Sequence, residues 1–266
     1  MSSHFVLEAA SCTDSGLVRA FNEDSLALDA DAGLLVLADG MGGYQAGDVA
    51  SQLATGIILE QVRAAQPHSG AAVVVREAVR KANSAIYEAA RSDARYHGMG
   101  TTLVLLLVRE GRAVIGHVGD SRLYRLRQGR LELMTEDHSL LREQVALGLI
   151  SAEEARVSHN RNLVTRALGV EANVGLELQE DAVLAEDIYL LCSDGLNDMV
   201  GDADIELVLA SLNSNLPLAA QQLVMIANDN GGHDNVSVML ARFTQPPAAP
   251  RGWFARTLGW FGAGRE

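Results

Sequence analysis

Short apolar runs rich in valine, leucine and isoleucine alternate with polar turns along most of the chain. Runs of this length are typical of β-strands. Several are joined by short turns, such as REGR at 109–112 and RQGR at 127–130, which favours hairpins and antiparallel sheets. The predicted strands are Phe5–Ala10, Leu26–Leu28, Leu34–Ala38, Thr102–Val108, Ala113–Val118, Leu123–Leu126, Ile188–Cys192 and Val236–Ala241.

Three other segments repeat apolar residues at the spacing of an amphipathic helix. The first two are separated by QPHSG at 66–70, so they are predicted to form a helical hairpin, and the third follows Pro217. Strands, a helix pair, more strands and a further helix predict a layered α+β fold. The repeated positions are Val49, Leu53 and Ile57, then Val75, Val79, Ala82 and Ile86, then Ala220, Leu223 and Ala227.

Two stretches depart from this pattern. Residues 136–172 are polar and helix-forming, and we expect them to form an insertion at a sheet edge, with Ser151 and Glu154 as a capping box. From Gln245 the chain changes to QPPAAP, a stiff linker, and then to an aromatic tail. We therefore expect one domain over 1–245 and a linker with tail over 246–266.

The composition narrows the function classes. Of 266 residues, 48% are apolar, which is enough for a sizeable core. The formal charge of −13 argues against nucleic acid as a partner. Cys12 and Cys192 match no zinc spacing and are expected to be reduced thiols of a cytoplasmic protein. The sequence has no signal-peptide pattern and no apolar run long enough to span a membrane.

Acidic residues stand at the ends of five predicted strands. A single Asp-Gly pair is more often a hairpin turn than a ligand. Carboxylates gathered at one end of a sandwich, however, would repel one another and raise one another's pKa unless cations neutralise them. Oxygen ligands select hard ions such as Mg²⁺ or Mn²⁺, and the absence of His and Cys here argues against zinc. The acids are Glu23, Asp24, Asp39, Asp120, Asp194 and Asp234.

Arg19 shortly precedes the first two of these acids. A guanidinium can donate hydrogen bonds to two phosphate oxygens at once. Standing alone, Arg19 could equally be a surface residue paired with an acid. Two cations about 3.5–4 Å apart are a standard arrangement in hydrolytic enzymes. Beside such a pair, Arg19 indicates a residue that binds a phosphoryl group, and hence a phosphoesterase.

These residues stand in motifs that together resemble the metal-dependent type 2C protein serine/threonine phosphatases, in their compact bacterial form. The resemblance spans residues 5–243 in the family's order. It implies a four-layer α-β-β-α sandwich, in which helical hairpins flank two central antiparallel sheets and the metals lie at one end. The motifs are RAFNEDS (19–25), LADGMGG (37–43), GTT (100–102), VGDSRLYRLR (118–127), VTRALG (164–169), LCSDGL (191–196) and GGHDNVSV (231–238).

The resemblance also implies a role for each candidate residue. Two Mn²⁺ or Mg²⁺ ions would share a bridging water that attacks the phosphorus directly, a third metal would bind more weakly, and the 136–172 insertion would be the flap beside the site. The resemblance implies that Asp39 bridges both ions, that the Gly40 carbonyl binds one of them, and that Asp194 and Asp234 bind the other. Glu23 and Asp24 would act through bound waters. Asp120 and Asp194 would bind the third metal, and Arg19 would bind the substrate phosphate.

One position departs from the family pattern. Many eukaryotic relatives carry histidine directly after the Asp-Gly pair, as the proposed acid for the leaving alkoxide, but Met41 stands here. We expect a water on the third metal, held by Asp120, to supply this proton. The weaker candidates are His138, His159 and His233.

Three functions stay open at this point. The first is an active phosphatase for phosphoserine and phosphothreonine, monomeric and opposing a bacterial serine/threonine kinase. The second is a catalytically silent binding module, and the third a hydrolase of another phosphoester such as a nucleotide. Asp39, Asp194 and Asp234 are all present, which favours activity.

The tail over 251–266 is aromatic and basic. A helix of this composition can lie on an anionic membrane surface or dock on a partner, which would place the protein peripherally at the membrane. Folding back on the domain, or fraying, is an equal alternative.

Overall fold

Two antiparallel sheets form the centre of the computed structural model, which describes residues 6–43, 46–66, 68–151, 154 and 163–244. One sheet has the strand order β1-β11-β10-β7-β8, and the other has the order β2-β3-β5-β6-β9, with the short β4 paired to β3. The strands are β1 (Val6–Asp14), β2 (Asp24–Asp29), β3 (Leu34–Met41), β4 (Gly100–Thr101), β5 (Leu103–Arg109), β6 (Arg112–Val118), β7 (Arg122–Arg127), β8 (Arg130–Leu133), β9 (Glu177–Ala182), β10 (Ile188–Cys192) and β11 (Val236–Thr244).

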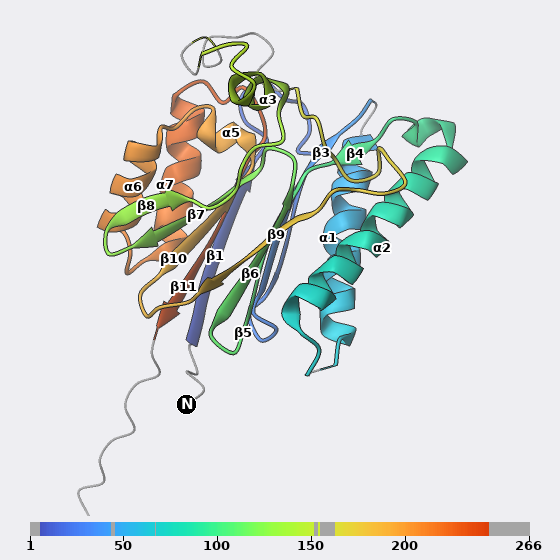
Figure 1. Ribbon diagram of the computed structural model, residues 1–266. Coiled ribbons are helices and arrows are strands. Elements are labelled where there is room, and N and C mark those ends of the chain that lie inside the picture. The colour runs from blue at the N-terminus through green and yellow to red at the C-terminus, as the bar shows by residue number, and fades with distance from the viewer. Residues whose placement is uncertain (1–5, 44–45, 67, 152–153, 155–162, 245–266) are drawn as a thin grey trace, which may run out of the picture.

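Helices cover the outer face of each sheet (Figure 1). The α1–α2 hairpin packs on the sheet that contains β3, and α6 with α7 packs on the sheet that contains β11. This is the predicted α-β-β-α sandwich. The helices are α1 (Ala46–Ala64), α2 (Ala71–Ser92), α3 (Leu140–Ala146), α5 (Asp194–Asn197), α6 (Asp202–Ser211) and α7 (Leu216–Asp229), with a 3₁₀ turn η1 (Ala94–Tyr96).

Strand β3 shows how the apolar pattern produces the layers. Its alternate residues face opposite sides of the sheet, so Leu34 and Val36 pack under α1 and α2 while Leu35 and Leu37 pack against the second sheet. Both faces are buried, which explains the unbroken apolar run. By the same alternation, Asp39 lies on the face turned toward the second sheet.

Some elements differ from their predicted bounds. Strand β3 continues to Met41, so Asp39 and Gly40 lie within a strand and not in a turn after it. Strands β8 and β9 and helix α6 are present although the apolar pattern does not predict them. The capping box is confirmed, because the Ser151 backbone N–H donates to Glu154 Oε2 at 2.7 Å and the Glu154 N–H donates to Ser151 Oγ at 3.2 Å.

The carboxyl end of β3, β4, α5 and α3 lie at the same end of the sandwich (Figure 1). Helix α3 belongs to the 136–172 insertion, of which residues 152–153 and 155–162 lie outside the described residues, as does the tail over 246–266. Within the described ranges, no helix combines the length and the apolar character that crossing a membrane requires.

Candidate functional site

The first pair of acids comes from neighbouring strands. Asp24 on β2 lies directly opposite Asp39 on β3, so both side chains project from the same face of the sheet. The backbone of Asp39 is fixed by Thr102: its N–H donates to Thr102 Oγ1 at 3.0 Å, and its carbonyl accepts from the Thr102 N–H at 2.9 Å. Two carboxylates are thereby held side by side at the end of a rigid strand.

Gly40 lies where the chain has no room for a side chain. A Cβ there would be 2.1 Å from the carbonyl oxygen of Gly47, in the first turn of α1. The Gly40 N–H donates to the Glu23 carbonyl at 3.1 Å, which ties β3 to the segment before β2. Burial raises the pKa of Glu23, while the backbone N–H groups of Asp48 and Gly47 oppose that shift. Glu23 therefore lies against the start of α1.

The second pair of acids comes from the other sheet. Asp194 is the first residue of α5, two residues after the end of β10, and Asp234 lies two residues before the start of β11. Hydrogen bonds join this sheet to the first one: Ser193 Oγ donates to Asp24 Oδ2 at 2.9 Å, and the Glu23 N–H donates to Asn235 Oδ1 at 2.8 Å. Acids predicted from separate motifs are thus brought together across the two sheets.

Arg19 and Asp120 complete the set. Arg19 donates to Asp234 Oδ2 at 2.7 Å from a half-exposed position. Asp120, only 8% exposed, lies in the turn after β6. The pKa of Arg19 is raised, first by its hydrogen bond to Asp234 and then by the charges of Asp234, Asp194 and Asp39, so its guanidinium faces the carboxylates. All eight predicted positions therefore lie at one end of the sandwich.

Burial and the neighbouring carboxylates together raise the pKa values of the clustered acids. Burial raises the pKa of Asp24 and of Asp120 to about 6. It raises the pKa of Asp39 and of Asp194 well above the usual range, and the neighbouring carboxylates add to both shifts. Burial is the largest cause of each shift, and repulsion between the gathered carboxylates adds to it.

Three buried oxygens of the cluster have no hydrogen-bond partner among the described residues. They are Glu23 Oε1, Asp24 Oδ1 and Asp194 Oδ1. A buried carboxylate oxygen without a partner is costly, and such oxygens are typical of cation ligands. The residues present therefore fit divalent cations held by oxygen.

Several residues that support the acids are missing from the sequence prediction. Asn235 donates through Nδ2 to the carbonyls of Ser15 and Phe21, at 3.1 and 2.9 Å, and thereby closes the loop that carries Arg19. Asp198 acts on the pKa of both Asp120 and Asp194. Both residues stand within or beside the quoted motifs, but Ser15, Phe21 and Asp120, on which they act, lie far away in sequence.

An α-β-β-α sandwich with acids from both sheets gathered at one end defines the architectural class of this protein. The family model described as protein phosphatase 2C matches residues 14–224. The chain therefore belongs to the protein phosphatase 2C family, as a bacterial member of the metal-dependent protein phosphatases.

Individual relatives agree with this assignment. The serine/threonine phosphatase stp of Listeria welshimeri is 37% identical, over 86% of this chain and 92% of its own length. PstP, a serine/threonine protein phosphatase of Mycobacterium tuberculosis, is 42% identical over 89% of this chain, which spans 45% of that relative.

Solved structures show the same fold. A crystal structure of M. tuberculosis PstP superposes with a TM-score of 0.85 at 40% identity, covering 90% of this chain and 100% of that one. A structure of the PstP catalytic domain in complex with two manganese ions has a TM-score of 0.83 at 39% identity, covering 91% and 100%.

Proposed function

We propose that this protein is a metal-dependent phosphatase that removes phosphate from phosphoserine and phosphothreonine in proteins. The observation that carries the proposal is the set of unpartnered buried carboxylate oxygens on Glu23, Asp24 and Asp194, contributed by both sheets. Mn²⁺ or Mg²⁺ would occupy this cluster, with a third ion beside Asp120. The manganese complex of PstP, a relative of the same fold, supports the choice of cation.

When bound, two divalent cations supply the nucleophile by lowering the pKa of a shared water, and they offset the charge of the carboxylates. The chain's residues hold and orient the reactants. Asp39 and the Gly40 carbonyl would bind at the end of β3, Asp194 and Asp234 would bind from the other sheet, and Glu23 and Asp24 would act through waters. Arg19 would release Asp234 and bind the substrate phosphate with its guanidinium.

The proposal extends to the surroundings of the enzyme. Phosphorylated proteins are its substrates, and a bacterial serine/threonine kinase opposes it in the cytoplasm. The tail over 251–266, which lies outside the described residues, would contact an anionic membrane or a partner through its aromatic and basic residues.

The proposal is tested by phosphate release from a phosphothreonine peptide. We expect activity with Mn²⁺, its loss in EDTA, and a loss of about 100-fold or more in Asp39→Asn, because the variant removes a charge that the cations require. Asp31→Asn is the matched control, since Asp31 is an exposed aspartate at the far end of the same β2–β3 hairpin.

Each competing function predicts a different result. A silent binding module would show no Mn²⁺-dependent release from any substrate. A hydrolase of another phosphoester would cleave nucleotides in preference to the peptide. Activity that persists in EDTA would contradict the two-metal site itself.

A further inference from the structure

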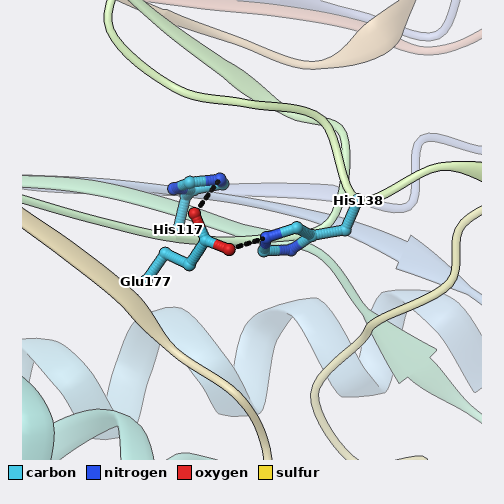
Figure 2. Close-up of side chains that lie close together, drawn as sticks. All are labelled: His117, His138 and Glu177. Atoms are coloured by element: carbon cyan, nitrogen blue, oxygen red, sulfur yellow. Dashed lines mark hydrogen bonds and ion pairs between the residues drawn. The ribbon is translucent and has the colours of Figure 1, made fainter. Parts of the chain in front are cut away.

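A second cluster of titratable side chains lies beside the acids. His117 comes from β6, His138 from the start of the 136–172 insertion, and Glu177 from the first residue of β9 (Figure 2). Both histidines are buried, and their rings stack with centroids 4.7 Å apart. One ligand atom from each residue lies within 4.8 Å of the other two, which is a spacing that could hold a metal ion.

The hydrogen bonds of His138 argue against a metal at this cluster. The Gly119 N–H donates to His138 Nδ1 at 3.1 Å, so the proton of the neutral ring must reside on Nε2. Nε2 then donates to Glu177 Oε1 at 2.9 Å and is not free to bind a cation. Arg166 Nη1 lies 3.0 Å from Glu177 Oε1 and 3.2 Å from His138 Nε2, so it places a positive charge beside two of the three candidate ligand atoms.

We propose instead that His138 is a positioning residue that holds the turn of Asp120 in place. Its ring accepts from the Gly119 N–H, and its own backbone N–H donates to the Gly119 carbonyl at 2.9 Å. Both backbone polar groups of Gly119, the residue before Asp120, are thus fixed by a single residue of the insertion. This inference rests on the proposed function, in which Asp120 binds a metal.

The turn that His138 holds is under steric constraint. Gly119 has φ of +106°, and a Cβ there would be 2.8 Å from the side chain of Thr102. Thr102 is the residue that fixes the backbone of Asp39, and its Oγ1 shares a 2.7 Å hydrogen bond with Ser121 Oγ. A displacement of the turn would therefore reach Asp39 as well as Asp120.

The ring of His138 is itself held in its orientation by Glu177. Glu177 fixes Nε2, and the pKa of Glu177 is lowered because His138, His117 and Arg166 outweigh the effect of its burial. The Thr165 N–H donates to the His138 carbonyl at 2.8 Å, so the two ends of the insertion meet at this residue. A hydrogen-bonded path thus runs from the half-exposed Arg166 to the buried turn of Asp120.

The test compares His138→Asn with His138→Gln. The Asn amide oxygen can replace Nδ1 as the acceptor for Gly119, whereas the Gln amide reaches only as far as Nε2. In the metal-free protein, we expect the Gly119 amide proton, followed by NMR, to exchange faster in His138→Gln than in His138→Asn. With Mn²⁺, the concentration for half-maximal activity should rise about tenfold in His138→Gln and much less in His138→Asn.

Two further comparisons keep the test decisive. Glu177→Ala, at a half-exposed position, should raise the Mn²⁺ requirement in the same direction without unfolding the protein. The controls His68→Asn and His68→Gln alter an exposed histidine in the α1–α2 loop and should match the wild type.

Equal Gly119 exchange in the two His138 variants, or an unchanged Mn²⁺ requirement in Glu177→Ala, would overturn the positioning role. An inactive wild type would instead contradict the proposed function and leave the exchange result as an independent measure of the turn.

Discussion

Asp39 is held through its backbone, which leaves its side chain available for chemistry. Besides Thr102, Thr101 Oγ1 donates to the Asp39 carbonyl at 2.8 Å. Two consecutive threonines of the GTT motif therefore fix the Asp39 carbonyl. The motif thus has a structural role that could not be predicted from its sequence alone. A carboxylate positioned in this way needs no side-chain partner to keep its direction.

The leaving alkoxide needs a proton, and the structure narrows the residues that can supply it. Met41, a thioether without a proton to give, pairs with Gly100 on β4. Both ring nitrogens of His138 are engaged, at Gly119 and Glu177, so this histidine is a poor acid. His159 lies outside the described residues. Asp120, through a water on a third ion, remains our proposal for the source of the proton.

Asp120→Ala tests that proposal. We expect turnover of a phosphothreonine peptide to fall by about 100-fold, the scale of a lost general acid, and that of p-nitrophenyl phosphate to fall much less. The reason is that p-nitrophenolate leaves without needing a proton. Steady-state rates on both substrates at saturating Mn²⁺ provide the measurement, and equal losses on the two would count against the role.

The described base of the 136–172 insertion is hydrogen-bonded to the strands and helices around the site. Leu168 exchanges backbone hydrogen bonds with Thr101, at 2.8 and 3.1 Å. Asn83 of α2 accepts from the Gly169 N–H at 2.8 Å and donates to the carbonyls of Glu171 and Ala172. The described end of the insertion is therefore part of the rigid framework around Asp39.

Gly169→Ala tests how far this attachment depends on close packing. Gly169 has φ of +84°, and a Cβ there would lie 2.1 Å from Ile86 Cγ2. Gly129 has a similar φ of +77° with nothing within 4 Å, which makes Gly129→Ala a control for backbone strain alone.

By urea unfolding, we expect Gly129→Ala to cost about 1–2 kcal/mol and Gly169→Ala about 1–3 kcal/mol more. Similar losses in both variants would show that the contact with Ile86 relaxes without cost.

The elements that the sequence predicted are those with a strong local signal. Strand β10 is buried along its whole length and α2 buries one stripe, so each has a clear apolar pattern. Strand β9, ELQEDA, is a largely polar edge strand, and its pairing with β6 is a long-range contact that periodicity cannot show. The Asp39-Gly40 sequence is typical of a turn, but pairing with β2 and β4 keeps these residues in a strand.

The site was predictable as a set of acids but not as a geometry. The repetition of acids at strand ends indicated one cluster, and the structure brings Asp24, Asp39, Asp194 and Asp234 together. The links from Ser193 to Asp24 and from Glu23 to Asn235 join residues 169 and 212 positions apart. Nothing local in the sequence specifies such pairs.

The contact predicted for the tail over 251–266 lies outside the described residues and stays a prediction. We expect full-length protein to co-sediment with liposomes that contain anionic lipids more than a 1–246 truncation does, because the tail offers aromatic and basic residues. Equal sedimentation of the two forms, with equal phosphatase activity in solution, would remove the membrane contact.

The two sheets contribute separate halves of the acidic cluster, and an apolar layer packs between the sheets. Leu37 lies two residues before Asp39 and Leu191 three before Asp194, and both side chains belong to that layer. The thickness of this layer therefore sets how far apart the two halves stand. Ions bound at the edge of this layer would cross-link the two sheets. The preference for a cation of a given radius would therefore depend partly on leucine side chains that do not contact the ion.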